Sequence, residues 1–261
     1  ETMPSLETGN TYSSWSGQKL EYVFDNTRER GLNLREGMRF KIFGEAYQEI
    51  DGNFNDLYVV GADFRVYKQL HRDLTFAGRV AGSTSLGSKR LVYYLGSVDN
   101  WINISSNVPT FDRSIPISQR DKYAFQSLAT NMRGFSQNVR NGNSFALVNA
   151  ELRWPVFRYF FNRPLSSDFF HNFQLVGFAD AGSAWVGLTP YSDKNKFHSR
   201  TLERGPITMT IDANRSAFVA GTGFGVRSTL FGYFIRADWA WGIADYEVYP
   251  GIFYLSLSLD F

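Results

Sequence analysis

The sequence contains no cysteine, only three histidines and no long apolar run. The lack of cysteine excludes disulfides and thiolate metal sites. Charged residues recur every few positions, and no stretch approaches the roughly 18 consecutive apolar residues that indicate a membrane-spanning helix. A helical membrane protein is therefore excluded.

An excess of charge of one sign is also missing, because 27 Lys and Arg residues stand against 25 Asp and Glu residues. Nucleic-acid binding would need a basic excess gathered on one face, so no nucleic acid is expected as a partner. Aromatic residues, in contrast, make up 17% of the 261 residues. A chain of this length is by default one domain.

The end of the chain alternates strictly between apolar and polar residues. In a strand, successive side chains point to opposite faces, so this segment has one apolar and one polar face. A strand of a soluble sandwich would show the same pattern, and the segment alone does not decide between the two. The residues of the apolar face are Phe253, Leu255, Leu257, Leu259 and Phe261.

The same alternation recurs along the chain with charged residues on the polar face. For example, Arg39 and Lys41 oppose Met38, Phe40 and Ile42. The charged faces carry both signs, as expected for side chains that line a polar lumen while the apolar face meets lipid. Aromatic residues at strand ends also favour a membrane, because amphipathic rings settle at the lipid headgroups. These residues include Trp154, Tyr159, Trp185, Tyr233 and Trp241.

The pattern predicts nine strands. Their ranges are 17–27, 37–48, 56–68, 74–84, 144–153, 173–186, 218–228, 233–242 and 252–261. Single-chain bacterial barrels use an even number of strands because both termini lie on the periplasmic side. A count of nine implies that the chain starts on the outer side, with at least one strand upstream. The alternative is a tenth strand at residues 120–132.

The predicted connections are of two kinds. Short turns, such as the one that ends near Asp73, suit the periplasmic side, whereas long polar segments suit extracellular loops. The long segments are residues 85–143 and 187–217. The first is unusually long, and loops of this length are commonly functional or disordered.

Two short motifs indicate a family. The first is Arg133, Gly134 and Phe135, near the end of the longest loop; the second is Phe178, Asp180 and Gly182, with one residue between each pair. With these motifs the sequence resembles the BamA/TamA-like outer-membrane assembly and translocation barrels, known as the bacterial surface antigen family. The resemblance spans essentially the whole chain. It implies an all-β fold, an antiparallel transmembrane β-barrel, of which residues 1–261 form the C-terminal part with nine or ten of sixteen strands.

The resemblance also implies a role for the loop tip, which in the family folds back into the barrel so that its Arg docks on the inner wall. A partly desolvated guanidinium left unpaired costs several kcal/mol, so Arg133 needs an acceptor. Alternation along its strand makes Asp180 the first candidate, with Glu151 and Asp238 as alternatives. This latch either only stabilises the barrel or also takes part in gating, and the sequence leaves both open.

Glycines are expected to make room for the packed lumen. Gly134 permits a tight backbone at the loop tip, and Phe135 is expected to pack inside the barrel. Gly221, Gly223 and Gly225 fall on one face of a predicted strand. Missing side chains there let a loop or a neighbouring backbone approach.

The closing strand has two implied roles. In the family and in other barrels, a C-terminal aromatic, here Phe261, ends the signal that the assembly machinery recognises. In the family, the last strand also forms a weakly closed seam with the first strand. A client strand can add to this edge by β-augmentation.

Catalysis is not expected from this chain. A hydrolase triad needs a Ser, a His and a third orienting group close together, and His71, His171 and His198 share no face with a marked Ser. The sequence also suggests no metal site and no cofactor.

The resemblance implies an outer-membrane barrel that inserts proteins into the bacterial outer membrane, or passes them across it, without ATP. The partners that it implies are outer-membrane lipids, client proteins, and periplasmic domains or lipoproteins. The alternative is a barrel that acts only as a membrane anchor or as a dedicated transporter for a fused or partner domain. A diffusion porin is disfavoured because an inward loop would plug the lumen.

Overall fold

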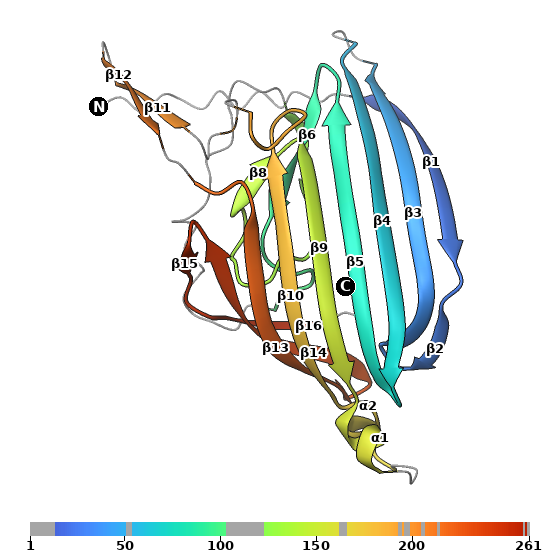
Figure 1. The fold of residues 1–261 in the computed structure, drawn as a ribbon. Helices are drawn as coiled ribbons and strands as arrows, with labels where there is room; N and C mark the ends of the chain where they lie inside the picture. Colours follow the sequence, from blue (N-terminus) through green and yellow to red (C-terminus); the bar gives the residue numbers. More distant parts are fainter. Residues whose placement is uncertain are drawn as a thin grey trace.

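The computed structural model describes residues 14–50, 54–102, 123–161, 166–192, 195, 199–204, 207–212, 215–257 and 259. Most of them belong to one curved antiparallel sheet of eleven strands (Figure 1). Its strands are β1 (Trp15–Asp25), β2 (Arg28–Gly31), β3 (Leu34–Glu49), β4 (Asp56–His71), β5 (Leu74–Leu86), β9 (Ser144–Trp154), β10 (Gln174–Trp185), β13 (Val219–Leu230), β14 (Tyr233–Ala244), β15 (Glu247–Val248) and β16 (Ile252–Leu257).

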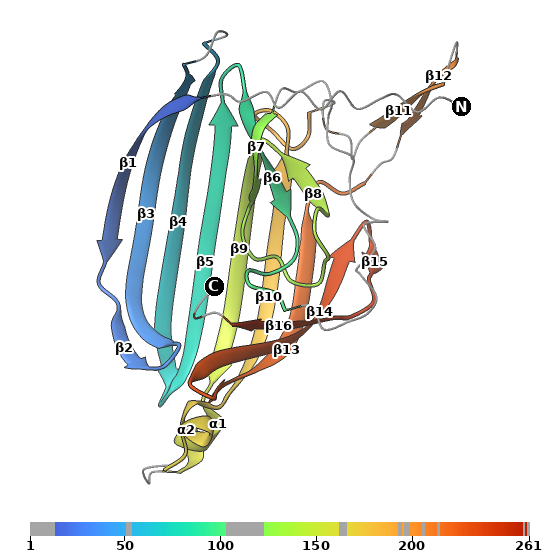
Figure 2. The same cartoon turned by 180° about the vertical axis from the view of Figure 1, so that it is seen from behind.

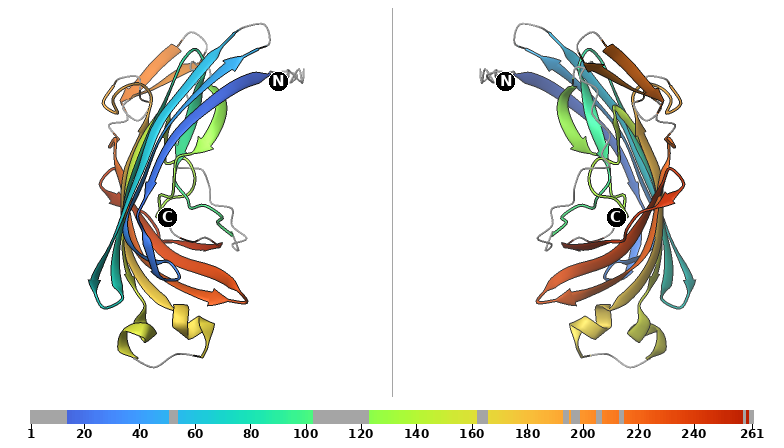
Figure 3. Two further views of the ribbon diagram at one scale, coloured as in Figure 1. Left: turned by 90° about the vertical axis from the view of Figure 1, so that its right-hand side faces the viewer. Right: turned by 90° about the vertical axis from the view of Figure 1, so that its left-hand side faces the viewer.

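The long strands form a meander, in which each strand pairs with the next long strand along the chain. Each of the nine segments predicted from alternation overlaps a strand of this sheet, and only its short strands β2 and β15 were not predicted. Residues 258, 260 and 261 of the last predicted segment lie outside the described part. In the described part of the chain the sheet is not closed, because β1 pairs with β3 alone and β16 with β14 alone among the strands. The views along the sheet show a trough with one convex and one concave face (Figure 3).

The two faces of the sheet have the reverse of the polarity that is usual in soluble proteins, because apolar side chains are exposed and charged side chains are buried. On β9, the outward Val148 and Leu152 are 48% and 42% exposed, whereas the inward Glu151 and Arg153 are 1% and 0% exposed. Apolar side chains therefore cover the convex face, and charged side chains are buried on the concave one. This arrangement suits a sheet whose outer face meets lipid.

The long connection between β5 and β9 packs against the concave face (Figure 2). It contains β6 (Arg90–Leu95), β7 (Tyr123–Leu128) and β8 (Arg140–Gly142), which form a separate three-stranded sheet. Met132 and Phe135 of this connection share an apolar cluster with Phe145 and Leu147 of β9. The loop is thus anchored by buried apolar contacts as well as by charge.

The alternative of a tenth strand of the main sheet at residues 120–132 is wrong. Tyr123–Leu128 is a strand, but it pairs in parallel with β6 in the small sheet. Its six residues are too few to span a membrane, which takes about 9–11 residues of a tilted strand. Residues 120–122 lie outside the described part.

The remaining elements lie at the two ends of the sheet. At one end α1 (Val156–Phe160) and α2 (Asp168–Asn172) connect β9 to β10. At the other end β11 (Ser199–Arg204) and β12 (Ile207–Asp212) form a hairpin within the predicted long segment 187–217. Among the described residues, no helix has the length and apolar character needed to cross a membrane.

The polarity of the sheet generates a test. Val148 lies near the middle of β9 on the convex face, so Val148→Arg should lower the free energy of unfolding in lipid vesicles by about 2–4 kcal/mol. Tyr233→Arg, at the exposed start of β14, should cost about 0–1 kcal/mol because it lies near the interface. Equal losses at the two positions would contradict a lipid-facing convex surface.

Candidate functional site

Arg133 lies at the centre of a buried ion-pair network on the concave face. Its Nε and Nη2 atoms donate to the two carboxylate oxygens of Asp180, each at 2.7 Å. Its Nη1 donates to Oε1 of Glu151 at 2.6 Å and lies 3.9 Å from Oδ2 of Asp238. The structure therefore brings together Arg133 and all three acidic residues named as candidate acceptors.

The contact with Asp180 has the geometry of a strong, specific pair. Two parallel N–H···O bonds between a guanidinium and a carboxylate fix orientation as well as distance. The backbone N–H of Arg133 also donates to Asp180, at 3.2 Å. Asn149 donates a further hydrogen bond to the same carboxylate at 2.8 Å.

The other two residues of the second motif, Phe178 and Gly182, have different neighbours. The guanidinium carbon of Arg133 is 3.7 Å from the centre of the Phe178 ring, and a cation over an aromatic face is stabilised electrostatically. Gly182 lies further along β10, and a Cβ there would be 2.6 Å from a side-chain carbon of Leu147. Phe178 and Asp180 thus contact the arginine, whereas Gly182 lets β9 and β10 pack closely.

Glu151 joins the loop arginine to arginines of the wall. Besides Arg133, it accepts hydrogen bonds from Arg153 at 2.8 Å and from Arg227 at 2.7 and 3.0 Å. Arg236 lies 3.9 Å from Glu151 and 3.4 Å from Asp238. None of these residues is more than 2% exposed.

The network holds four guanidinium groups and three carboxylates, so one positive charge is in excess. Removing charges from water costs several kcal/mol per ion unless each is paired and hydrogen-bonded. The carboxylates and guanidinium groups of the site therefore stabilise one another, and loss of a carboxylate leaves buried positive charge without compensation. The roles of Arg227 and Arg236 were missed from the sequence, although the same alternation that points Asp180 inward also points them inward.

The backbone of the loop tip lies directly against β13 and β14. A Cβ at Gly221 would overlap the carbonyl oxygen of Arg133, and a Cβ at Gly242 would overlap that of Gly134. Gly134 itself has φ +93°, a conformation that favours glycine. The prediction that missing side chains admit the loop is confirmed at Gly221.

The other two glycines of that row serve the wall itself. A Cβ at Gly223 would overlap the carbonyl of Trp239, and one at Gly225 would overlap the carboxylate of Asp238. These positions allow close packing within the network and between strands, and the predicted approach of a neighbouring backbone is confirmed at Gly223.

Tyr254 connects the loop tip to the last strand. Its hydroxyl accepts a hydrogen bond from the N–H of Gly134 at 3.1 Å and donates one to the carbonyl of Phe135 at 2.7 Å. Both Tyr254 and Phe135 are buried, and the Phe135 ring packs edge-on against Tyr249. The sequence carried no signal for this contact beyond the inward face of Tyr254.

The loop also covers the outer edge of β16, the edge not paired with β14. The N–H of Ile102 donates to the carbonyl of Leu255 at 2.7 Å, and Trp101 forms an antiparallel bridge with Ser256. The side chain of Asn100 reaches the carbonyl of Leu257 at 3.4 Å. Residues 100–102, here called the edge segment, thus occupy backbone groups that a free edge strand would expose.

The residues of the predicted seam strand fall partly on β16. Phe253 and Leu257 are exposed on the convex face, and Leu255 between them is half-buried. Leu259 is exposed beyond the end of the strand, and Phe261 lies outside the described residues.

The described residues contain no cluster of three or more His, Cys, Asp or Glu side chains that could hold a metal ion. His71 lies at the β4–β5 turn, where Nδ1 is 2.8 Å from the Tyr159 hydroxyl. His171 lies in α2, and His198 is outside the described part.

A curved antiparallel sheet with an apolar outer face, a charged inner face and a loop docked on that inner face is typical of outer-membrane barrel proteins. More specifically, the chain belongs to the Omp85 superfamily, because the family model of the Omp85 superfamily domain matches residues 16–261. No match was found among curated proteins.

Charge balance around Arg133 predicts an order of mutational effects. Asp180→Asn leaves four guanidinium groups against two carboxylates and should lower the free energy of unfolding by about 3–5 kcal/mol. Arg133→Met leaves three against three and should cost less. The double variant restores the original excess of one positive charge, so its loss should be smaller than the sum of the single losses.

The matched control is Glu36→Gln, which removes the exposed Arg30–Glu36 ion pair and should cost about 0–1 kcal/mol. Unfolding would be followed in the same lipid vesicles for all variants. Additive losses for the double variant would contradict a single coupled network.

Proposed function

We propose that this chain is the C-terminal part of a sixteen-strand barrel of the bacterial outer membrane, which inserts proteins into that membrane or passes them across it. Membership of the Omp85 superfamily supports the proposal. So does the apolar convex face, which suits contact with lipid. Further strands would complete the barrel between β1 and β16.

One observation carries the functional part of the proposal: a single loop holds both the inner wall and the last strand. Arg133 binds Glu151 and Asp180 of the wall, while the next two residues bind Tyr254 of β16. A loop tip in this position can couple its own docking on the wall to the opening or closing of the seam at β16. This favours a gating role for the latch in addition to a stabilising one.

In the proposed mechanism, a client strand adds to the outer edge of β16. An extended segment can join an exposed strand edge through backbone hydrogen bonds, and no ATP, cofactor or catalytic residue is needed for that exchange. The edge segment now occupies the groups that a client would use, including the carbonyl of Leu255. Client entry therefore requires the edge segment to leave, so that backbone hydrogen bonds are exchanged for others of the same kind.

Depletion of the full-length protein in its native cell tests the general function. Quantitative proteomics of the outer membrane should then show a broad loss of unrelated barrel proteins, and Arg133→Ala should reproduce part of that loss. If only one protein or none disappears, the assembly function fails, and the dedicated transporter or membrane anchor takes its place.

A covalent lock tests the exchange at the strand edge. Because the chain has no cysteine, Trp101→Cys with Ser256→Cys introduces one defined pair at an observed bridge. Directly paired antiparallel residues have Cα atoms about 4.5–5.5 Å apart, which a disulfide can span. The oxidised variant should fail to restore assembly in depleted cells, and reduction should restore it.

The matched control is Ala237→Cys with Leu255→Cys, which locks β16 to β14 across a pair that the mechanism keeps intact. This variant should support assembly in both redox states. If the oxidised Trp101 and Ser256 lock is equally active, strand addition at this edge is wrong.

A further inference from the structure

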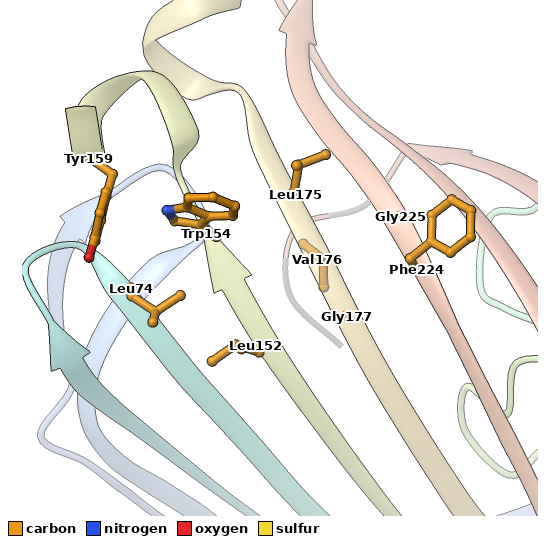
Figure 4. Close-up of a pocket in the computed structure, with 9 residues that line it drawn as sticks. All are labelled: Leu74, Leu152, Trp154, Tyr159, Leu175, Val176, Gly177, Phe224 and Gly225. Carbon is orange, nitrogen blue, oxygen red and sulfur yellow. The ribbon is translucent and has the colours of Figure 1, made fainter. Parts of the chain in front are cut away.

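The convex face carries one groove that the docked loop and the seam do not use. It has a volume of about 570 Å³, within the range of about 300–1,000 Å³ that is typical of small-ligand sites. Figure 4 shows the groove at the end of the sheet next to α1, with Trp154 and Tyr159 at one end and Leu152, Leu175 and Phe224 along it. Its lining is almost entirely apolar.

The groove exists because one outward position lacks a side chain. Gly177 pairs with Leu152 of β9 on one side and with Phe224 of β13 on the other. A Cβ built at Gly177 would meet nothing within 4 Å. The side chains of Leu152 and Phe224, which are 42% and 53% exposed, thus lie on either side of a notch one residue wide.

Aromatic rings close the groove toward the end of the sheet. Trp154 packs edge-on against Tyr159, with ring centres 5.8 Å apart, and against Phe160 at the same distance. Trp and Tyr prefer the level of the lipid headgroups. The notch at Gly177 therefore lies at acyl-chain depth when these rings lie at the membrane surface.

A cation lies at the aromatic end of the groove. Arg72, exposed in the β4–β5 turn, donates to the backbone carbonyl of Tyr159 at 3.0 Å, and its guanidinium lies 5.4 Å from the Tyr159 ring centre. The neighbouring Arg158 is paired with Asp73. The two contacts of Arg72 with Tyr159 hold a positive charge beside the aromatic end of the groove.

We propose that this groove binds one phospholipid of the periplasmic leaflet, with an acyl chain in the Gly177 notch and the phosphate at Arg72. An apolar slot that ends at a guanidinium matches a molecule with a long hydrocarbon chain and an anionic head, and Arg pairs well with phosphate oxygens. The leaflet follows from the short turns and helices at this end, opposite the long loops. The site rests on the proposed placement in an outer membrane.

Photolabelling of the full-length protein in lipid nanodiscs tests the site. A small fraction of the phosphatidylglycerol carries a diazirine halfway along one acyl chain, and labelled residues are mapped by mass spectrometry. Labelling should concentrate at Leu152, Leu175 and Phe224, and exceed that at outward residues elsewhere, such as Ile42 and Val60.

Gly177→Leu should fill the notch and lower this labelling several-fold. The matched control is Gly44→Leu, because Gly44 of β3 is also outward and a Cβ there would meet only a carbonyl oxygen at 4.0 Å. It should leave labelling of the groove unchanged. Equal labelling of all outward residues, or no effect of Gly177→Leu, would overturn the proposal.

Arg72→Gln should lower groove labelling about fivefold at low salt, since a basic residue near an anionic lipid surface contributes about that factor in binding. Arg28→Gln, an exposed arginine of β2 at the same end, should have little effect. Displacement of the label by lipopolysaccharide but not by unlabelled phospholipid would overturn the choice of ligand. Absence of labelling at every outward residue would instead overturn the membrane placement, and with it the proposed function.

Discussion

The position of the loop depends on one buried electrostatic arrangement, in which the guanidinium of Arg133 forms ion pairs with Asp180 and Glu151 of the wall. Without it, the carboxylates of Glu151 and Asp180 would keep only their wall partners in a space filled by protein. Burying ions is favourable only when every charge is paired and hydrogen-bonded. The docked loop therefore contributes to the stability of the wall. Its apolar contacts add to the stabilisation that the ion pairs provide.

Glycines on the inner face of the sheet let the loop and its ion pairs pack closely against the wall. The inner face of β13 brings Gly221 against the loop backbone and Gly225 against Asp238, so ion pairs form without a gap between loop and wall. The outer face of the same sheet uses Gly177 for the opposite purpose, as a vacancy between large apolar side chains. Glycine thus allows close approach of backbones on the inner face and leaves space between apolar side chains on the outer face.

Period-two alternation predicts most of the sheet, because an apolar outer face and a charged inner face leave a strong mark on each strand. It also points Asp180, Glu151 and Asp238 inward, toward Arg133. What it does not predict depends on contacts between distant parts of the chain. Tyr123–Leu128 looks like another strand of the sheet, yet it pairs with β6, and neither the bridge from Trp101 to Ser256 nor the hydrogen bonds of Tyr254 have a local pattern. Barrel closure likewise remains a prediction.

The hydroxyl of Tyr254 has a thermodynamic consequence. Because it bonds two residues of the loop tip, the conformations of the tip and of the last strand are not independent. Coupling between two sites is reciprocal by necessity. The docked tip stabilises the ordered position of β16, and the ordered β16 stabilises the docked tip by the same free energy. A ligand that binds only to the displaced strand would therefore weaken the docking of Arg133. Undocking of Arg133 would strengthen the binding of that ligand by the same factor.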